Sequence, residues 1–374
     1  MITALPPPPA IEQPAPYQLS FGVVAGVAAP GTRRVIVRVG TRTLADRPLR
    51  QRRFKLLVVL PETETSVQIV AVDRAGRRSR ETVSHVLGAI TPAGPRRARP
   101  PRGDPQLARD VRRLAARFGN TSAIYVQNLV SGAGAAWNAR ATFPAGSALK
   151  LAIAVTALAR TEGTPASGST LDRLLRQMLI YSDNAAANGT ERYFGGSTSG
   201  GSALVNTMMQ SLGLSDTEMY GGYEVDAIGD PPRALAGGIP LRVESQPSWG
   251  RGKKTSAYDL ASLLRGVWLA ADGRGPLRAA QPGFSPADGR YLLYLLAHVR
   301  DSGKLDREVG RIPGVRLLHK AGWIDAARHD NGIVLWRGGA VIVTVMTYRG
   351  AGAGVSSDVL AGRVAAAALR RFRR

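Results

Sequence analysis

The chain has 374 residues, which is enough for two or three domains of ordinary size. It contains no cysteine, so disulfides, thiolate metal sites and cysteine nucleophiles are excluded. The formal net charge is +23, and arginine supplies nearly all of the positive charge. Such a charge favours contact with a polyanion, although an arginine-biased, solvated surface is the simpler interpretation because the arginines are scattered through both halves.

The amino-acid composition of the first part of the chain changes twice. Residues 1–16 are rich in proline, and we expect them to be disordered or to form polyproline II. Residues 17–90 contain short β-rich runs separated by Gly, Pro and Asp, which predicts a small all-β domain of the immunoglobulin-like type. The segment VQIVAVDRAGRRS resembles the late strand and turn of bacterial immunoglobulin-like modules. Residues 91–104 are dominated by proline and arginine and predict an extended linker.

The second part begins at Asp104-Pro105, an N-cap residue and a first-turn proline that together predict the start of a helix. Two predicted strands follow, and then a series of helices with a loop-rich stretch over residues 215–254. Three predicted strands and a last helix end the chain. This order predicts an α+β fold for residues 105–374, with an antiparallel sheet flanked by helices and a helical subdomain inserted into it.

The first candidate motif is Ser147-Ala148-Leu149-Lys150, in the apolar segment FPAGSALKLAIAV. Residues i and i+3 share one face of a helix, so the hydroxyl and the amine should be neighbours. A serine hydroxyl needs a base before it attacks a carbonyl group, and apolar surroundings lower the pKa of a lysine towards that role. A helix-capping serine is the alternative, but a lysine inside an apolar helix is costly without a task.

Two further motifs contain polar residues suited to a cleft. Ser182-Asp183-Asn184 follows a predicted helix, where a hydroxyl can relay a proton and an amide can bond another amide. Turns of this composition also end helices, which is the alternative interpretation. Lys320-Ala321-Gly322 lies on a predicted late strand, where the lysine supplies a positive field and the glycine permits close backbone approach.

The order SxxK, SDN and KxG resembles the serine β-lactamase and penicillin-binding (DD-peptidase-like) superfamily, most closely the class A β-lactamase-like proteins. The similarity extends over roughly residues 105–374. It implies that Ser147 is acylated, that Lys150 is its base or proton shuttle, and that Ser182 passes a proton to the leaving nitrogen. It also implies an oxyanion hole formed by the backbone N–H groups of Ser147 and Trp323. The residues with an implied substrate-binding role are Asn184, Lys320, Gly322 and Trp323.

The chain departs from the family pattern in three places. Ala321 replaces a hydroxyl residue, which removes one hydrogen bond to a substrate carboxylate, worth about 0.5–1.5 kcal/mol. The interval between the first two motifs is shorter than in class A enzymes, which predicts a trimmed helical subdomain. The deacylating glutamate has no clear equivalent: Glu224 is the best candidate, with Glu218 and Glu244 behind it, and an exposed loop carboxylate is the alternative interpretation of Glu224.

These features predict a serine hydrolase that forms an acyl-enzyme with a β-lactam or a peptidoglycan-derived amide, without a metal or a cofactor. The alternative is a non-hydrolytic penicillin- or cell-wall-binding protein on the same fold, with an anionic cell-wall polymer as a partner. No nucleic-acid-binding motif and no apolar stretch of membrane-spanning length is present, so neither partner is expected. The substrate class predicts export to the cell wall, periplasm or exterior, although MITALPPPPAIEQPAP does not read as a signal peptide.

Overall fold

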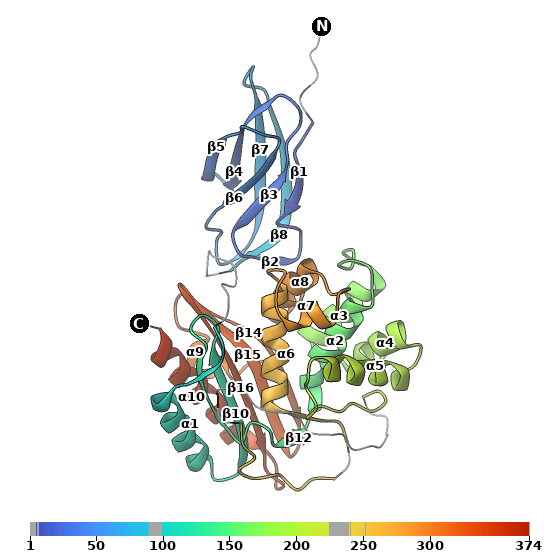
Figure 1. Ribbon diagram of the computed structural model, residues 1–374, viewed down its shortest axis with the longest axis vertical. Helices are drawn as coiled ribbons and strands as arrows, with labels where there is room; N and C mark the ends of the chain where they lie inside the picture. Colours follow the sequence, from blue (N-terminus) through green and yellow to red (C-terminus); the bar gives the residue numbers. More distant parts are fainter. Residues whose placement is uncertain are drawn as a thin grey trace. The chain divides into compact units, whose positions relative to one another are not determined.

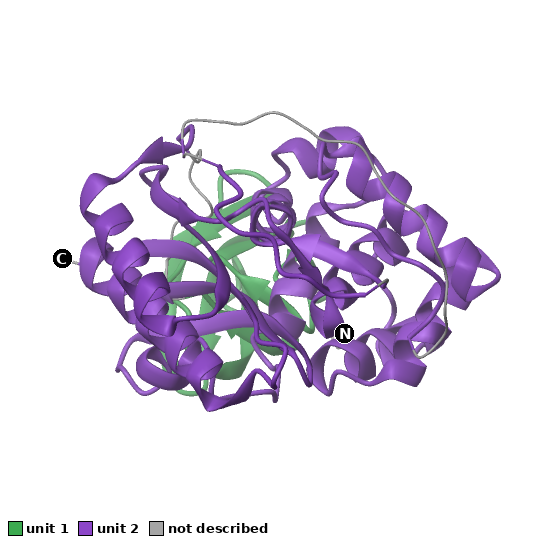
Figure 2. Ribbon diagram, turned by 90° about the horizontal axis from the view of Figure 1, so that it is seen from below, with its two compact units in different colours: residues 1–94 green, residues 95–374 purple. Residues whose placement is uncertain are grey.

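The computed structural model describes residues 5, 7–89, 99–223, 239, 241–250 and 252–373. The chain divides into two compact units, residues 1–94 and 95–374, which Figure 2 shows in different colours. Helices and strands occur together in the second unit, so the protein belongs to the α+β class. Within the ranges just given, no helix combines the length and the hydropathy that crossing a membrane requires.

Unit 1 is a β-sandwich of two sheets, with strand orders β1-β3-β6 and β2-β8-β7-β4-β5 (Figure 1). Its strands are β1 (Ala10–Gln13), β2 (Gln18–Ser20), β3 (Val23–Val27), β4 (Thr32–Val39), β5 (Arg42–Pro48), β6 (Arg53–Leu57), β7 (Glu64–Asp73) and β8 (Arg78–Gly88). Val24 and Phe54 from the smaller sheet share one buried apolar core with Val35 and Ile69 from the larger sheet. The alternation of β-branched residues along these strands accounts for this two-layer packing.

The N-terminal segment corrects the expectation of disorder throughout residues 1–16. Residues 10–13 form β1, which runs antiparallel to β3 with Ile11 opposite Gly26. Gly26 permits this pairing, because a Cβ atom at that position would lie 2.3 Å from the carbonyl oxygen of Ala10. Neighbouring prolines are tolerated because β1 is an edge strand, whose outer N–H groups need no partner.

Unit 2 is centred on a six-stranded sheet of order β14-β15-β16-β10-β11-β9. The strands are β9 (Arg102–Gly103), β10 (Thr121–Asn128), β11 (Ala133–Trp137), β14 (Val315–Ile324), β15 (Ala327–Trp336) and β16 (Gly339–Tyr348). The expectation that all of residues 91–104 form a linker is wrong for residues 102–103. These two residues form β9, which pairs with β11 in the sheet. Residues 91–98 lie outside the described ranges.

Helices cover both faces of this sheet (Figure 1). On one face, α1 (Pro105–Phe118) and α10 (Gly354–Phe372) pack on an apolar core that includes Val343 and Val345 of β16. α6 (Ala257–Ala270) covers the other face, where Asn331 of β15 donates a hydrogen bond to the Leu260 carbonyl oxygen at 3.1 Å. The side chain of Asp104 caps α1 by accepting from the Leu107 N–H, as the sequence predicts.

Most of the remaining helices form a subdomain inserted between β11 and β14, together with a short two-stranded sheet. These helices are α2 (Lys150–Ala159), α3 (Thr170–Ile180), α4 (Asn184–Gly195), α5 (Thr198–Ser211), α7 (Pro276–Ala280) and α8 (Pro286–Leu296). The short helix α9 (Asp306–Val309) packs instead on α10, and its Val309 belongs to the core shared by α1 and α10. The strand β12 (Thr142–Pro144) pairs with β13 (Lys254–Ser256), which brings the two ends of the segment from α2 to α5 together. Asp216 holds these ends in place, since it ion-pairs with Arg140 and accepts a hydrogen bond from Ser256.

Candidate active site

Ser147 lies on a 3₁₀ turn, η1 (Gly146–Leu149), which continues directly into α2. In a 3₁₀ turn the side chains at i and i+3 eclipse each other. This geometry places the Lys150 Nζ atom 2.9 Å from the Ser147 Oγ atom, so the ammonium group donates a hydrogen bond to the hydroxyl oxygen. The spacing in the SxxK motif therefore produces direct contact between the nucleophile candidate and the base candidate.

Lys150 is fully buried and donates to polar groups of the second motif. Its Nζ atom bonds the Asn184 Oδ1 atom at 2.6 Å and the backbone carbonyl oxygen of Ser182. Together with the Ser147 hydroxyl oxygen, these two oxygens make three acceptors, one for each hydrogen of the ammonium group. The two motifs thus meet at one point, through residues 147, 150, 182 and 184, although more than thirty residues separate them in the sequence.

Ser182 connects the two lysines of the site. Its backbone has a φ of 61°, in the left-handed region that non-glycine residues rarely adopt. Its carbonyl oxygen accepts from Lys150, while its Oγ atom accepts from the Lys320 Nζ atom at 2.9 Å. An unfavourable backbone conformation that is held by such contacts is typical of functional sites. Asp183 caps α4, so the SDN triplet starts a helix in addition to ending one.

Lys320 is buried on β14, the edge strand of the large sheet. Burial lowers the pKa of its ammonium group to about 8, although the carboxylates of Asp301 and Asp330 favour the charged form. Its Nζ atom also donates to the Ala321 carbonyl oxygen at 2.7 Å. The site therefore contains a second positive group, on the opposite side of Ser182 from Lys150.

The backbone of β14 passes directly beside the nucleophile turn. A Cβ atom built on Gly322 would lie 2.8 Å from the Ser147 backbone nitrogen and 2.4 Å from that of Ala148. A Cβ atom on Gly146, whose φ is 50°, would lie 3.1 Å from the Trp323 backbone nitrogen. A side chain at position 322 would collide with this backbone, so glycine allows residues 322 and 323 to lie directly beside residues 146–148. The Trp323 side chain is 58% exposed.

Tyr223 is a residue of the site that the motifs did not indicate. Its hydroxyl donates to the Gly146 carbonyl oxygen at 3.1 Å, and its ring centroid lies 4.6 Å from the Lys150 Nζ atom. The Lys253 Nζ atom lies 5.3 Å from the same ring and donates to the Gly222 carbonyl oxygen at 2.7 Å. The scarcity of lysine was the one sequence signal that could have directed attention to Lys253.

Two of the three candidate deacylating carboxylates are described, and neither has a recorded contact with Ser147 or Lys150. The Glu218 carboxylate pairs with the Lys254 ammonium group at 3.3 Å, beside the β12–β13 sheet. Glu244 is exposed, and its backbone N–H donates to the Asn138 Oδ1 atom at 2.7 Å. Glu224 lies outside the described residues.

The comparisons with known proteins agree with this geometry. The family model described as the beta-lactamase enzyme family matches residues 106–164 and 161–372. The structure of PBP-A and that of a PBP-A mutant as an acyl-enzyme complex with penicillin G are 22% and 21% identical to this chain, with TM-scores of 0.54 and 0.55. In each case the aligned region covers 74% of this chain and 99% of PBP-A.

Class A beta-lactamases have the same fold. An ancestral class A enzyme of Gram-negative bacteria is 19% identical, with a TM-score of 0.54, over 71% of this chain and 100% of the enzyme. The class A beta-lactamase from Mycobacterium abscessus is 18% identical, with a TM-score of 0.53, over 72% of this chain and 100% of the enzyme. No curated protein matches the chain. At these identities the solved structures establish the fold of unit 2 and leave the reaction to be argued from the site.

Proposed function

Since the chain belongs to the beta-lactamase enzyme family, we propose that it is a serine hydrolase that forms an acyl-enzyme at Ser147 and then hydrolyses it. The substrate class is a β-lactam or a peptidoglycan-derived amide. The observation that carries this proposal is the continuous set of hydrogen bonds from Ser147 through Lys150 and Ser182 to Lys320. Peptidoglycan lies outside the cytoplasmic membrane, so the proposal includes export of the protein.

In the proposed reaction, the Ser147 Oγ atom attacks the amide carbonyl carbon while Lys150, in its neutral form, accepts the hydroxyl proton. The backbone N–H groups of Ser147 and Trp323 stabilise the oxyanion of the tetrahedral intermediate. The C–N bond then breaks as Ser182 delivers its hydroxyl proton to the leaving nitrogen, and the proton that Lys150 took from Ser147 passes to Ser182 and restores its hydroxyl group. The Lys320 ammonium group supports this step, because it is hydrogen-bonded to the Ser182 Oγ atom and supplies positive charge for a substrate carboxylate.

A non-hydrolytic penicillin- or cell-wall-binding protein is the second candidate function. The positions of Glu218 and Glu244 favour it, because neither of these two carboxylates, the candidates within the described residues, contacts the nucleophile or its lysine. Without a base to activate water, an acyl group on Ser147 would be released slowly. A penicillin-binding protein would share the acylation step and differ in the lifetime of the adduct, whereas a protein that only binds cell-wall polymer would form no adduct.

The deciding experiment is a time course of intact mass after addition of penicillin G. We expect an increase by the mass of the ligand, followed by return to the original mass as product accumulates. Trypsin should release residues 141–150 as one peptide, ATFPAGSALK, in which Ser147 is the only serine. A permanent adduct on this peptide would favour a non-hydrolytic penicillin-binding protein, and no adduct on it would contradict acylation at Ser147 and leave only binding of cell-wall polymer.

The contact between β14 and the nucleophile turn gives a separate prediction. Gly322→Ala should lower the acylation rate by about 100-fold, because a displacement on the order of 1 Å in a reacting group has this effect. The added methyl group would meet the Ser147 and Ala148 nitrogens and push the strand away. Gly350→Ala is the matched control, because no atom lies within 4 Å of its Cβ position. Equal acylation rates for the two variants would contradict the predicted contact.

A further inference from the structure

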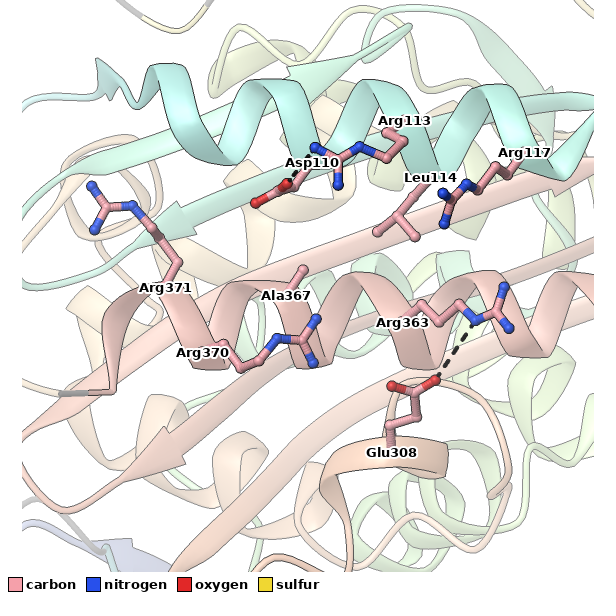
Figure 3. A pocket seen from close by; sticks show the side chains of 9 residues that line it. All are labelled: Asp110, Arg113, Leu114, Arg117, Glu308, Arg363, Ala367, Arg370 and Arg371. Carbon is pink, nitrogen blue, oxygen red and sulfur yellow. Dashed lines mark ion pairs between the residues drawn. The ribbon is translucent and has the colours of Figure 1, made fainter.

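An arginine-lined groove lies between α1 and α10 (Figure 3). It has a volume of about 560 Å³. Arg113 and Arg117 extend into it from α1, and Arg363 and Arg370 extend from α10, while Leu114 lies between the two helices. Arg371 lines the same groove, but its guanidinium group pairs with Asp104 at 3.0 Å.

The groove has an excess of positive charge. Its nine lining residues include five arginines and two carboxylates, Asp110 and Glu308. Asp110 pairs with Arg113 at 3.3 Å and Glu308 with Arg363 at 4.0 Å, and both pairs are exposed enough to contribute little. Arg117 and Arg370 have no ion pair within the described part of the chain. The guanidinium groups of the four arginines other than Arg371 repel one another unless an anion lies between them.

Helix stability does not account for this arrangement. Basic residues in the last turn of a helix interact favourably with its dipole, which would explain Arg117, Arg370 and Arg371. Arg113 and Arg363 lie before the last turn of their helices, where this effect has faded. Their presence on the two facing sides of the groove needs a different reason.

The dimensions and the lining indicate the kind of anion. Arg113 and Arg117 are four residues apart, about 6 Å along the helix axis, and Arg363 and Arg370 are about 10 Å apart. One compact anion cannot contact all four guanidinium groups, whereas an extended chain of anionic groups can. None of the lining residues is an exposed large apolar side chain, which disfavours a lipid surface. A groove of this volume holds a single polymer segment and is too small for a nucleic-acid duplex.

The groove and the nucleophile lie on opposite faces of the large sheet. α1 and α10 pack on the face formed by Val343 and Val345. His329 of β15 points to the other face, where its Nε2 atom lies 2.7 Å from the Pro144 carbonyl oxygen, three residues before Ser147. A polymer in the groove would therefore leave the access to Ser147 free.

We propose that the groove between α1 and α10 binds a linear phosphate polymer through Arg113, Arg117, Arg363 and Arg370. Guanidinium groups bind phosphate oxygens through paired, charge-assisted hydrogen bonds. The polymer holds the protein at a surface or matrix that carries it, while the serine on the opposite face acts on its own substrate. This site is independent of the reaction at Ser147, so failure of either proposal leaves the other intact.

The test measures binding of the full chain to inorganic polyphosphate and to poly(glycerol phosphate) at several salt concentrations. The variant is Arg117→Gln with Arg370→Gln, and the control is Arg160→Gln with Arg192→Gln, which removes the same charge from exposed positions just after α2 and on α4. We expect the groove variant to weaken binding at least about 10-fold. The slope of log K against log salt should become less steep by about 1.4, since each lost contact with a single strand removes about 0.7.

The outcomes distinguish binding in the groove from binding to the basic surface of the protein in general. Unchanged binding by the control, together with wild-type acylation of Ser147 in both double variants, would support the proposal. Equal weakening by both double variants would overturn it, because the polymer would then contact the basic surface as a whole. Equally tight, groove-dependent binding of polyglutamate would overturn the assignment to phosphate. Tighter binding of one phosphate polymer than of the other identifies the source of the ligand.

Discussion

Replacing Ser147 by alanine should abolish the covalent adduct with penicillin G completely. The substitution removes the hydroxyl oxygen that receives a hydrogen bond from Lys150, and a methyl group cannot attack a carbonyl carbon. The fold should survive, because Ser147 is only partly buried and η1 needs no side-chain cap. Intact mass after prolonged exposure is the measurement, with thermal unfolding to confirm that the variant is folded.

Thr142→Ala is the matched control, because Thr142 supplies the only other hydroxyl group of the peptide 141–150. It lies on β12, and its side chain has no recorded contact with the lysine of the motif. The control should acquire the adduct as the unmodified protein does. An adduct on Ser147→Ala would mean that a different residue is acylated, and the proposed function would be wrong.

The second large effect is expected from Lys150→Met, which should slow acylation by about 10²–10⁴-fold. Methionine has a similar length and fills the buried space, but it cannot accept the proton of Ser147 or donate to Asn184. The variant also leaves the Asn184 Oδ1 atom and the Ser182 carbonyl oxygen without this donor, so unfolding should become easier by about 1–3 kcal/mol. Stopped-flow acylation and denaturant unfolding measure the two effects separately.

Lys304→Met separates catalysis from stability. Lys304 is also a buried lysine, and its ammonium group pairs with Asp301. Its replacement should lower stability but slow acylation far less than Lys150→Met does, because Lys304 acts on the site only through the electrostatic field at Lys320. If both lysine variants slowed acylation equally, loss of stability would explain the result and Lys150 would have no special role.

Local signals in the sequence were sufficient for those parts of the structure that depend on neighbouring residues. The N-cap and proline at Asp104-Pro105 start α1, and the i, i+3 spacing of Ser147 and Lys150 produces their contact. The order of the three motifs was also informative, because the fold brings them together. Even here, the sequence did not show that Ser182 adopts a left-handed backbone.

Contacts between distant segments could not be predicted in this way. Tyr223 and Lys253 lie in loop-rich sequence, and their positions depend on how β12 and β13 close the subdomain. The strand β1 was missed because proline predicts disorder only where no sheet edge is available to pair with. The groove is formed by α1, near the start of unit 2, and α10, near its end. The sequence of either helix alone therefore shows only part of the positive charge of the groove.

The strand order of the large sheet has a consequence for the synthesis of the protein. β10 is paired with β16, so Thr121 and its partner Tyr348 are separated by almost the whole length of unit 2. A newly made chain presents Ser147 early, but β14, whose backbone lies against the nucleophile turn, emerges much later. Unit 1 can fold first as an independent module, whereas contacts of such long range form slowly and only after the late strands have been made. The nucleophile therefore cannot reach its active geometry before β14 has been synthesised.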